Sequence, residues 1–402
     1  MRASGTYSSR RDAVLRLAGK PPRGSLSRRD SAFSRRLCHE VTAWRARLDW
    51  SLARLVKRPL QGLEPAVLAA LRLGAAQLIL LKTPPHAAVS ETVQAAPRRA
   101  RGLVNAVLRR LAREGEGSGP KELHVRYSHP RPLVERWIHR LGRERTEGLL
   151  AWNNSIPELG WFCLEDDCPG RPGRYLAGYR LLDDEDLPEE GLSGLLDRHR
   201  AYVQDEAAAL VGRGAGMLAR GRILELGAAP GGKTLHLAGR GPVVAVDLSA
   251  RRMRTWRRNA RRLDLLECVG VAADAGALPL SRPFDTVMVD APCTGTGVYR
   301  RRRDARYGWS QTLLEGCVRS QTELLEAAAS LLTPGGVLIY STCSLEPEEN
   351  QQAVKRLEDR HSDLSRVGFP APDKLVSRGM VSIFPPDSGI DGMFAAAWKK
   401  AP

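Results

Sequence analysis

The chain has 402 residues, 43% of them hydrophobic, and a formal net charge of +17. This length indicates two or three domains. The most apolar window, LAALRLGAAQLILL at residues 68–81, is too short to span a bilayer and contains Arg72, and the first residues lack the apolar stretch of a signal peptide. Seven cysteines, scattered and odd in number, exclude a disulfide framework. We therefore expect a cytoplasmic protein with no membrane partner. We also expect a monomer, although none of these observations bears on the oligomeric state.

The positive charge is concentrated near the beginning of the chain. Residues 1–125 carry 24 Lys and Arg against 9 Asp and Glu, a net charge of +15. Such an excess favours a polyanionic partner, because each contact with a phosphate releases counterions. Arginine outnumbers lysine, which suits bidentate phosphate contacts, although an arginine-rich composition can also reflect genomic bias. The charge thus favours nucleic acid without deciding it.

The first third of the chain has the pattern of a helical domain. Leu52, Leu55 and Val56 recur at helical spacing, and Pro65 suits the first turn of another helix. Strand signals are nearly absent before EGEGSGP, a segment typical of a linker. We expect an all-helical domain over residues 1–120, a small α/β subdomain over residues 121–200 and a core over residues 201–402.

From about Gly221 the sequence alternates between strand, glycine turn and helix. RILELG, VVAVDLS, ECVGVAADA, FDTVMVDAP and GVLIYSTCS are strand segments, with helical stretches between several of them. The alternation predicts an α/β fold with a Rossmann-like, doubly wound parallel sheet. Ligands of such sheets bind at the carboxyl ends of the strands.

A glycine-rich turn, ILELGAAPGGKT at residues 223–234, follows the first core strand. Backbone N–H groups at the following helix start would face a polar or anionic ligand. The segment also fits G-x-x-x-x-G-K-[ST], so a P-loop NTPase is an alternative, with Asp290 as the second-motif aspartate. Pro230 counts against that alternative, because it removes one N–H from the loop.

The spacing of acidic residues favours an adenosyl ligand. Asp247 ends the next strand, twenty residues after Gly227, which suits a carboxylate that binds a ribose diol. Asp274 ends the following strand-like segment, within reach of an adenine amino group. The pattern favours S-adenosylmethionine over ATP and leaves ATP as the alternative.

Two cysteines follow two core strands. DAPCTGTG places Cys293 three residues after Asp290, and STCS places Cys343 at the end of a later strand. Either cysteine alone would ordinarily be a small buried residue. Together they suit addition of a thiolate to carbon 6 of a pyrimidine, which lets carbon 5 accept a methyl group from a sulfonium donor. This chemistry needs a nucleophile, a hydrogen bond to the ring and help in removing the carbon-5 proton. One thiol can be the nucleophile, a carboxylate can bind the ring, and the second thiol can help to remove the proton.

Several ordered blocks carry a family resemblance. GAAPGGKT, DAPCTGTG, STCSLEPEEN and DGMFAA resemble the signature blocks of the Sun/Fmu (RsmB-type) family of ribosomal small-subunit RNA (cytosine-5)-methyltransferases, in the NOL1/NOP2/Sun superfamily. PPHAAVSETV and GLVNAVLRR resemble the NusB-like RNA-binding domain of bacterial members. The resemblance covers nearly the whole chain. It implies a NusB-like domain, a Rossmann-like core, S-adenosylmethionine as cofactor and methylation of carbon 5 of a cytosine in 16S ribosomal RNA.

The resemblance also implies residue roles. Cys343 would attack carbon 6 and Cys293 would assist release, while Asp290 would contact the target base and border the cofactor. Asp247 would hold the ribose hydroxyls, and Asp274 would lie near the adenine. The loop around the methionine and ribose would consist of Gly227, Ala228, Ala229, Pro230, Gly231, Gly232 and Lys233.

Three further interpretations concern other parts of the sequence. The basic segment YRRRRDARYGW at residues 299–309 is expected to bind phosphate at the mouth of the site, with Tyr299, Tyr307 and Trp309 stacking on bases. Cys163 and Cys168 are close in sequence, but no second ligand pair completes a zinc site, so we expect no metal. A non-enzymatic RNA-binding protein with a vestigial core is a second alternative, and both intact cysteine motifs argue against it.

Overall fold

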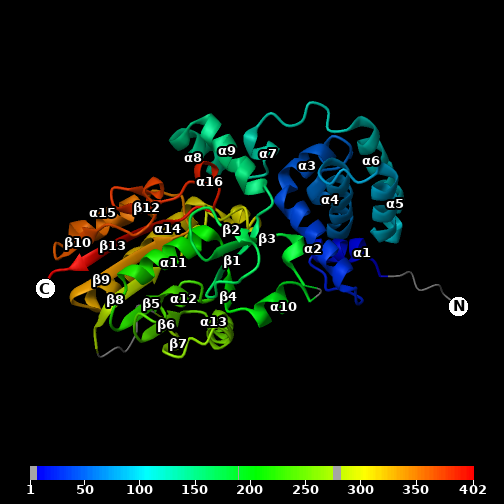
Figure 1. Ribbon diagram of the computed structural model, residues 1–402. Coiled ribbons are helices and arrows are strands. Elements are labelled where there is room, and N and C mark those ends of the chain that lie inside the picture. Colours follow the sequence, from blue (N-terminus) through cyan, green and yellow to red (C-terminus); the bar gives the residue numbers. More distant parts are fainter. Residues whose placement is uncertain (1–6, 189, 275–281) are drawn as a thin grey trace. The chain divides into compact units, whose positions relative to one another are not determined.

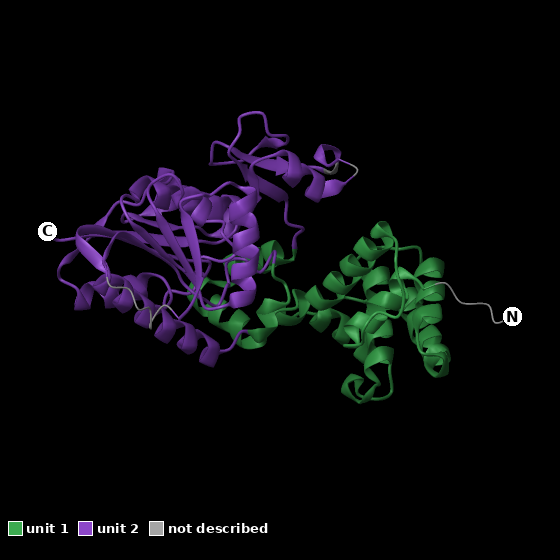
Figure 2. Cartoon of the chain, turned by 90° about the horizontal axis from the view of Figure 1, so that it is seen from below, with its two compact units in different colours: residues 1–154, 302–308 green, residues 155–301, 309–402 purple. Residues whose placement is uncertain are grey.

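The computed structural model describes residues 7–188, 190–274 and 282–402. The chain forms two compact units, one of residues 1–154 with 302–308 and one of residues 155–301 with 309–402 (Figure 2). The domain boundaries expected at residues 120 and 200 stay a prediction. Within the described ranges, no helix is both long enough and apolar enough to cross a membrane.

The first unit is built from helices, and no strand forms among its described residues. The helices are α1 (Ser9–Leu17), α2 (Arg28–Ala43), α3 (Arg45–Ala53), α4 (Pro65–Ile79), α5 (Pro85–Ala95), α6 (Arg101–Glu114), α7 (Leu123–Arg126), α8 (Arg131–Leu141) and α9 (Arg143–Asn154). Pro65 is the first residue of α4, as its spacing predicts. Helix α4 contacts α1, α2, α3, α5 and α6, and its apolar residues are the centre of this core. Gly74 permits the close approach of α6, because a Cβ there would lie 2.3 Å from Leu108.

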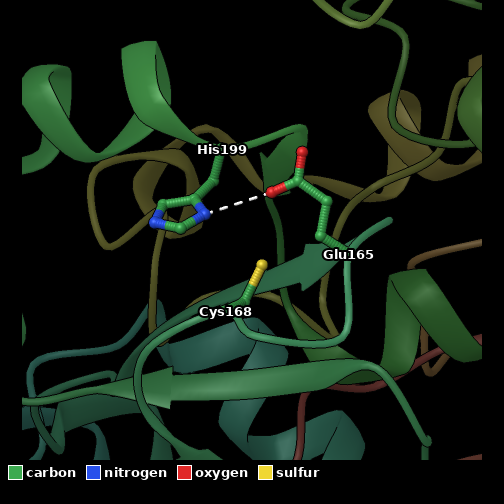
Figure 3. A group of neighbouring side chains, drawn as sticks. All are labelled: Glu165, Cys168 and His199. Carbon is green, nitrogen blue, oxygen red and sulfur yellow. Dashed lines mark hydrogen bonds and ion pairs between the residues drawn. The ribbon is translucent and has the colours of Figure 1, made fainter.

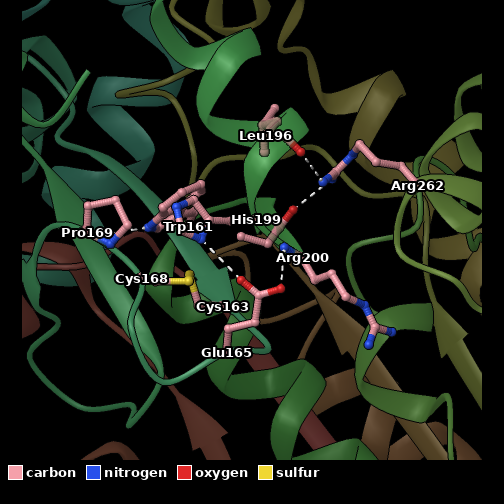
Figure 4. The surroundings of a disulfide bond; sticks show 10 residues. Trp161, Cys163, Glu165, Cys168, Pro169, Leu196, His199, Arg200 and Arg262 are labelled. Carbon is pink, nitrogen blue, oxygen red and sulfur yellow. Dashed lines mark hydrogen bonds and ion pairs between the residues drawn. A yellow bond between two sulfur atoms is a disulfide. The ribbon is translucent and has the colours of Figure 1, made fainter. Parts of the chain in front are cut away.

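The second unit contains a small antiparallel sheet in the order β2-β3-β1-β4. Its strands are β1 (Leu159–Cys163), β2 (Arg171–Pro172), β3 (Tyr179–Leu182) and β4 (Ala201–Val203), and helix α10 (Gly191–Arg198) precedes the last of them. Trp161 on β1 is fully buried. Cys163 and Cys168 form a disulfide beside it (Figure 4). The sequence argued against a disulfide framework, and this single local bridge was not predicted.

The large sheet of the second unit has the order β11-β12-β13-β9-β8-β5-β6-β7 (Figure 1). Its strands are β5 (Ile223–Leu226), β6 (Val243–Asp247), β7 (Cys268–Ala272), β8 (Phe284–Asp290), β9 (Leu332–Thr342), β10 (Leu364–Val367), β11 (Val376–Ser377), β12 (Met380–Ser382) and β13 (Phe394–Lys400). The strands from β5 to β9 pair in parallel, which confirms the Rossmann-like α/β fold. Strand β13, which the sequence analysis did not predict, joins β9 in antiparallel pairing and carries β10 and β12.

Helices cover both faces of this sheet, because alternate strand residues point to opposite sides. The helices of this part of the chain are α11 (Glu206–Leu218), α12 (Thr234–Leu237), α13 (Ala250–Arg262), α14 (Gln311–Ser330), α15 (Gln351–Arg360) and α16 (Pro385–Ser388). Ile223 shares a core with α11 and α13, whereas the next residue, Leu224, shares a core with α14 and α15. The result is a three-layer arrangement with apolar cores on both faces.

Candidate active site

The predicted site residues follow strands that meet at one edge of the sheet. From β5 the chain proceeds through β6 and β7 on one side, and β8 and β9 lie on the other. In open sheets of this kind, ligands bind where the winding direction changes, outside the carboxyl ends of the strands. Asp247 ends β6, Asp290 ends β8, and Cys343 directly follows β9. Segments far apart in the sequence therefore converge at this edge of the sheet.

The glycine loop after β5 folds back onto β6. The N–H groups of Gly227 and Ala228 both donate to the carbonyl oxygen of Val246, at 2.9 and 3.0 Å. Gly227 has φ +79°, and a Cβ there would lie 2.1 Å from the Asp290 carbonyl oxygen, so only glycine fits. Since these two donors are occupied and Pro230 has none, this part of the loop differs from a phosphate cradle.

Asp247 lies beneath the same loop. Its Oδ1 accepts a hydrogen bond from the Ser249 N–H at 2.8 Å and forms an ion pair with Arg252 at 2.8 Å. Its Oδ2 lies 3.3 Å from the Ala229 N–H. The carboxylate is only 2% exposed, yet Arg252 is largely exposed at the rim. Arg252 is one of several arginines in the segment ARRMRTWRRNARR, and nothing in the sequence marks it as the partner of Asp247.

Asp290 is fixed by two side chains from other segments. Nζ of Lys233 lies 2.8 Å from Oδ2, and the Ser341 hydroxyl donates to Oδ1 at 2.8 Å. Burial lowers the pKa of Lys233, but the Asp290 carboxylate more than offsets this and raises that pKa above its ordinary value. Lys233 therefore stays an ammonium facing Asp290, in addition to belonging to the glycine loop.

The two predicted cysteines lie in contact, with 3.2 Å between the sulfurs of Cys293 and Cys343. The hydrogen bond from Cys293, assisted by nearby Lys233, holds the pKa of Cys343 below its ordinary value despite burial. The pKa of Cys293 is raised well above its ordinary value, mainly because this thiol donates that bond and also because it is buried. The pair thus has one sulfur suited to carry the negative charge and one suited to carry the proton.

A buried carboxylate, Glu349, links the two cysteine-bearing loops. It accepts hydrogen bonds from the N–H and hydroxyl of Thr294, beside Cys293, with the N–H at 2.8 Å. It also accepts from the hydroxyl of Ser344, beside Cys343, and from Gln321 at 3.0 Å. Burial raises the pKa of Glu349 above its ordinary value. STCSLEPEEN contains this residue, but the sequence offered no sign that its side chain spans both loops.

Comparisons with known proteins agree with this geometry. The family model described as 16S rRNA methyltransferase RsmB/F matches residues 218–399, and the NusB family model matches residues 3–113. Ribosomal RNA small subunit methyltransferase B of Pseudomonas putida is 33% identical over 396 residues, covering 92% of this chain and 90% of its own. Its counterpart in Klebsiella pneumoniae is 32% identical over 385 residues, with 87% of each chain covered. The chain belongs to the RsmB/F family of 16S rRNA methyltransferases.

Solved structures confirm the fold of this RsmB/F chain. The crystal structure of PH0851 covers 100% of both chains with a TM-score of 0.78 at 21% identity. A methyltransferase homolog from Pyrococcus horikoshii is 25% identical, has a TM-score of 0.56 and covers 69% of this chain and 97% of its own. The resemblance inferred from the motifs is thus confirmed at the level of family, fold and methyltransferase activity.

A second buried carboxylate supports the glycine loop of this RsmB/F core. Glu225 on β5 accepts a hydrogen bond from the Thr234 hydroxyl at 2.5 Å, and Trp256 donates to the same hydroxyl at 2.8 Å. Burial raises the pKa of Glu225 to about 8. At neutral pH this carboxyl is therefore mostly protonated, and it anchors the start of α12 without adding a negative charge to the site.

Asp274 is exposed and lies two residues beyond the end of β7. Residues 275–281, which follow it, lie outside the described residues. Its place near an adenine stays a prediction.

The interpretation of residues 299–309 as an exposed phosphate-binding segment was wrong. Arg300, Arg303 and Arg306 are each at most 7% exposed, and Tyr299 and Trp309 are also buried. Arg303 pairs with Glu40, and Arg306 donates to Asn154 at 2.8 Å, both within the first unit. Within the second unit, Arg301 pairs with Asp205 at 2.7 Å and with Asp391 at 2.8 Å. These partners are far away in sequence, so the local charge pattern gave no sign of burial.

Proposed function

We propose that this methyltransferase transfers a methyl group from S-adenosylmethionine to carbon 5 of a cytosine in 16S ribosomal RNA, through a bond between Cys343 and carbon 6. The observation that carries the proposal is the contact of Cys343 with Cys293, 3.2 Å apart, next to the Lys233–Asp290 pair. The relatives named above are small-subunit rRNA methyltransferases, which supports the choice of substrate.

The proposed site for S-adenosylmethionine lies at the ends of β5 and β6. We assign its binding to the loop from Gly227 to Lys233 and to Asp247, whose buried carboxylate suits ribose hydroxyls. Asp290 would border the cofactor, and Asp274 would lie near the adenine. When bound, the cofactor supplies an electrophilic methyl group on a sulfonium. The loop donors described above are engaged by the protein, which favours this ligand over the triphosphate of the P-loop alternative.

The remaining steps belong to residues of this chain. The Cys343 thiolate attacks carbon 6, and carbon 5 becomes nucleophilic enough to accept the methyl group. Asp290, held by Lys233 and Ser341, steadies the ring at N3 and the exocyclic amino group. The carbon-5 proton then leaves with help from Cys293, the carbon–carbon double bond re-forms, and the Cys343–carbon 6 bond breaks.

The first unit is proposed to bind the RNA. The NusB family model covers residues 3–113, and residues 1–125 carry the +15 charge. Affinity should therefore fall steeply with salt, since neutralised phosphates release counterions. The division at residues 120 and 200, the monomeric state and the cytoplasmic location are parts of the same proposal.

A direct test is the identity of the product. Unmodified 16S rRNA is incubated with the protein and methyl-labelled S-adenosylmethionine, then digested to nucleosides and separated. We expect the label in 5-methylcytidine for wild type and no label for Cys343→Ser. Label in any other nucleoside would contradict the proposed chemistry while leaving the family membership intact.

A further inference from the structure

The small sheet carries a cluster of metal-ligating side chains outside the active site. Glu165 and Cys168 lie in the loop between β1 and β2, and His199 lies between α10 and β4 (Figure 3). One carboxylate oxygen, one sulfur and one imidazole nitrogen of these residues all lie within 4.8 Å of one another. Cys163, the last residue of β1, adds a second sulfur through its bond to Cys168 (Figure 4).

Neighbouring groups orient this cluster. Nδ1 of His199 lies 3.1 Å from Oε2 of Glu165, while Oε1 of Glu165 accepts from the Arg200 N–H at 3.1 Å. The Trp161 ring packs edge-on against the imidazole with 5.7 Å between ring centroids. The indole N–H of Trp161 donates to the carbonyl of Pro169 at 3.3 Å, next to Cys168. Side chains held in this way lose little freedom when they bind an ion.

We propose that Cys163, Cys168, His199 and Glu165 form a redox-gated site for a thiolate-binding divalent cation of the zinc type. Two thiolates, an imidazole and a carboxylate are a donor set for tetrahedral zinc, and four residues between the cysteines match the spacing of zinc-binding pairs. In the disulfide form neither sulfur is a thiolate, so the same residues hold no such ion.

Cleavage of the Cys163–Cys168 disulfide requires a reductant, and a cellular dithiol can be that reductant through thiol–disulfide exchange. The Cys163–Cys168 bond breaks and takes up two electrons and two protons, while the dithiol becomes a disulfide. When the cation binds, both thiol protons pass to solvent, two sulfur–metal bonds form, and neutral His199 coordinates through Nδ1 with its proton on Nε2.

Two observations favour a working reduced form. The other five cysteines are free, so nothing else marks this chain as one from an oxidising compartment. The proposed rRNA substrate also belongs to the reducing cell interior, where disulfides are rare. The sequence predicted no metal, because it contains no second ligand pair beside Cys163 and Cys168. The structure brings a single histidine and a single glutamate instead, 34 residues apart in the chain.

Cobalt chloride is the probe, because Co²⁺ replaces Zn²⁺ and is visible by absorption. Tag-free protein is prepared oxidised, and reduced with a phosphine that is then removed. We expect the reduced protein to bind one Co²⁺ per chain, with tetrahedral ligand-field bands and a thiolate-to-cobalt charge-transfer band that Zn²⁺ abolishes. The oxidised protein should show neither band. Cys168→Ser and His199→Ala should weaken binding about tenfold or more, whereas Cys38→Ser, a free cysteine of the first unit, should match wild type.

Two results would overturn the site. One is a reduced wild-type protein without a charge-transfer band in excess Co²⁺, and the other is Cys168→Ser with an unchanged spectrum. Because the oxidised and reduced wild-type proteins differ in no residue, that comparison decides the question even if a variant folds poorly. The readout involves neither RNA nor methyl transfer, so it is independent of the proposed function.

Discussion

Two pairs of cysteines lie in the second unit, and their surroundings set different chemistry. Cys163 and Cys168 are five residues apart and joined by a disulfide, whereas Cys293 and Cys343 are fifty residues apart with unbonded sulfurs 3.2 Å from each other. The first pair closes one short loop. The second pair depends on two strands of the sheet and on the Glu349 carboxylate between their loops. Its contact is therefore a product of the tertiary fold, with Lys233 as a nearby positive charge.

The largest expected effect is at the nucleophile. Cys343→Ala removes the only sulfur we assign to carbon 6, so methylation should fall about a thousandfold or more. The rate of methyl transfer to 16S rRNA at saturating cofactor measures this. Cys317→Ala, another free cysteine of the same unit, is the control and should retain most of the activity. If Cys343→Ala methylates within tenfold of the wild-type rate, Cys343 is not the nucleophile. The active-site pair would then be no different from the other cysteines of this unit.

A second prediction concerns the link between the cysteine loops. Glu349→Gln keeps the size of the side chain but removes its charge and leaves some of its four donors without an acceptor. We expect the turnover number to fall about tenfold to a hundredfold and the free energy of unfolding to fall by about 1–3 kcal/mol. Because the Glu349 charge raises the pKa of both thiols, alkylation of Cys343 should shift to lower pH.

The control for this variant is Asp359→Asn on α15, which removes an exposed charge from the helix that begins two residues after Glu349. It should change neither the turnover number nor the alkylation profile. If Glu349→Gln loses stability but its alkylation profile stays in place, the residue supports the loops without tuning the thiols.

The cofactor site predicts a smaller change. Asp247→Asn removes a charged acceptor for the ribose, and S-adenosylmethionine should bind about tenfold more weakly by calorimetry. Arg252→Met removes the exposed ion partner of the same carboxylate and should change affinity less than Asp247→Asn does. Equal affinity in Asp247→Asn and wild type would remove Asp247 from the cofactor site. Magnesium-dependent ATP binding to wild type would instead support the P-loop alternative.

The smallest effect on the reaction is expected at Glu225, where the change is in the pH dependence of stability. Burial raises the pKa of Glu225 from its ordinary value of 4.5 to about 8, so its contribution is fully present below pH 4.5 and is lost as pH rises through about 8. The difference in unfolding free energy between wild type and Glu225→Gln should therefore change across that window, by at most about 1.4 kcal/mol per pH unit. Asp391, with a pKa raised to about 7, titrates in both proteins and cancels from the difference. A flat difference from pH 5 to pH 8 would show that Glu225 does not titrate there.

The parts of the site that the sequence predicted are those at strand ends with recognisable motifs. The alternation of the core strands with helices is visible in the sequence, and parallel strands place their carboxyl ends together. Four residues at these strand ends or just beyond them could therefore be expected to converge: Asp247, Asp290, Cys293 and Cys343. Which sulfur is favoured as thiolate was not visible, because it depends on the contact with Cys293 and, to a smaller extent, on the charge of Lys233. That residue is read from the sequence as part of the glycine loop, yet it reaches Asp290, 57 residues away.

The parts that the sequence did not predict depend on partners distant in the chain. Glu349 joins Thr294 across 55 residues, and Arg303 meets Glu40 across 263 residues. Composition indicates that a segment is basic but not whether acidic partners will bury it, which is why residues 299–309 were misread. Strand β13 was missed because its antiparallel pairing with β9 falls outside the strand–helix alternation that identified the core.

The most direct test of the central claim is covalent capture of RNA by single cysteine variants. In Cys293→Ala the Cys343–carbon 6 bond should still form, and release should be slow, so protein and 16S rRNA should co-migrate on a denaturing gel in the presence of S-adenosylmethionine. Cys343→Ala and the double variant should give no such band. Capture by Cys343→Ala but not by Cys293→Ala would reverse the two roles. The absence of any band, with methylation retained in both single variants, would contradict the covalent mechanism.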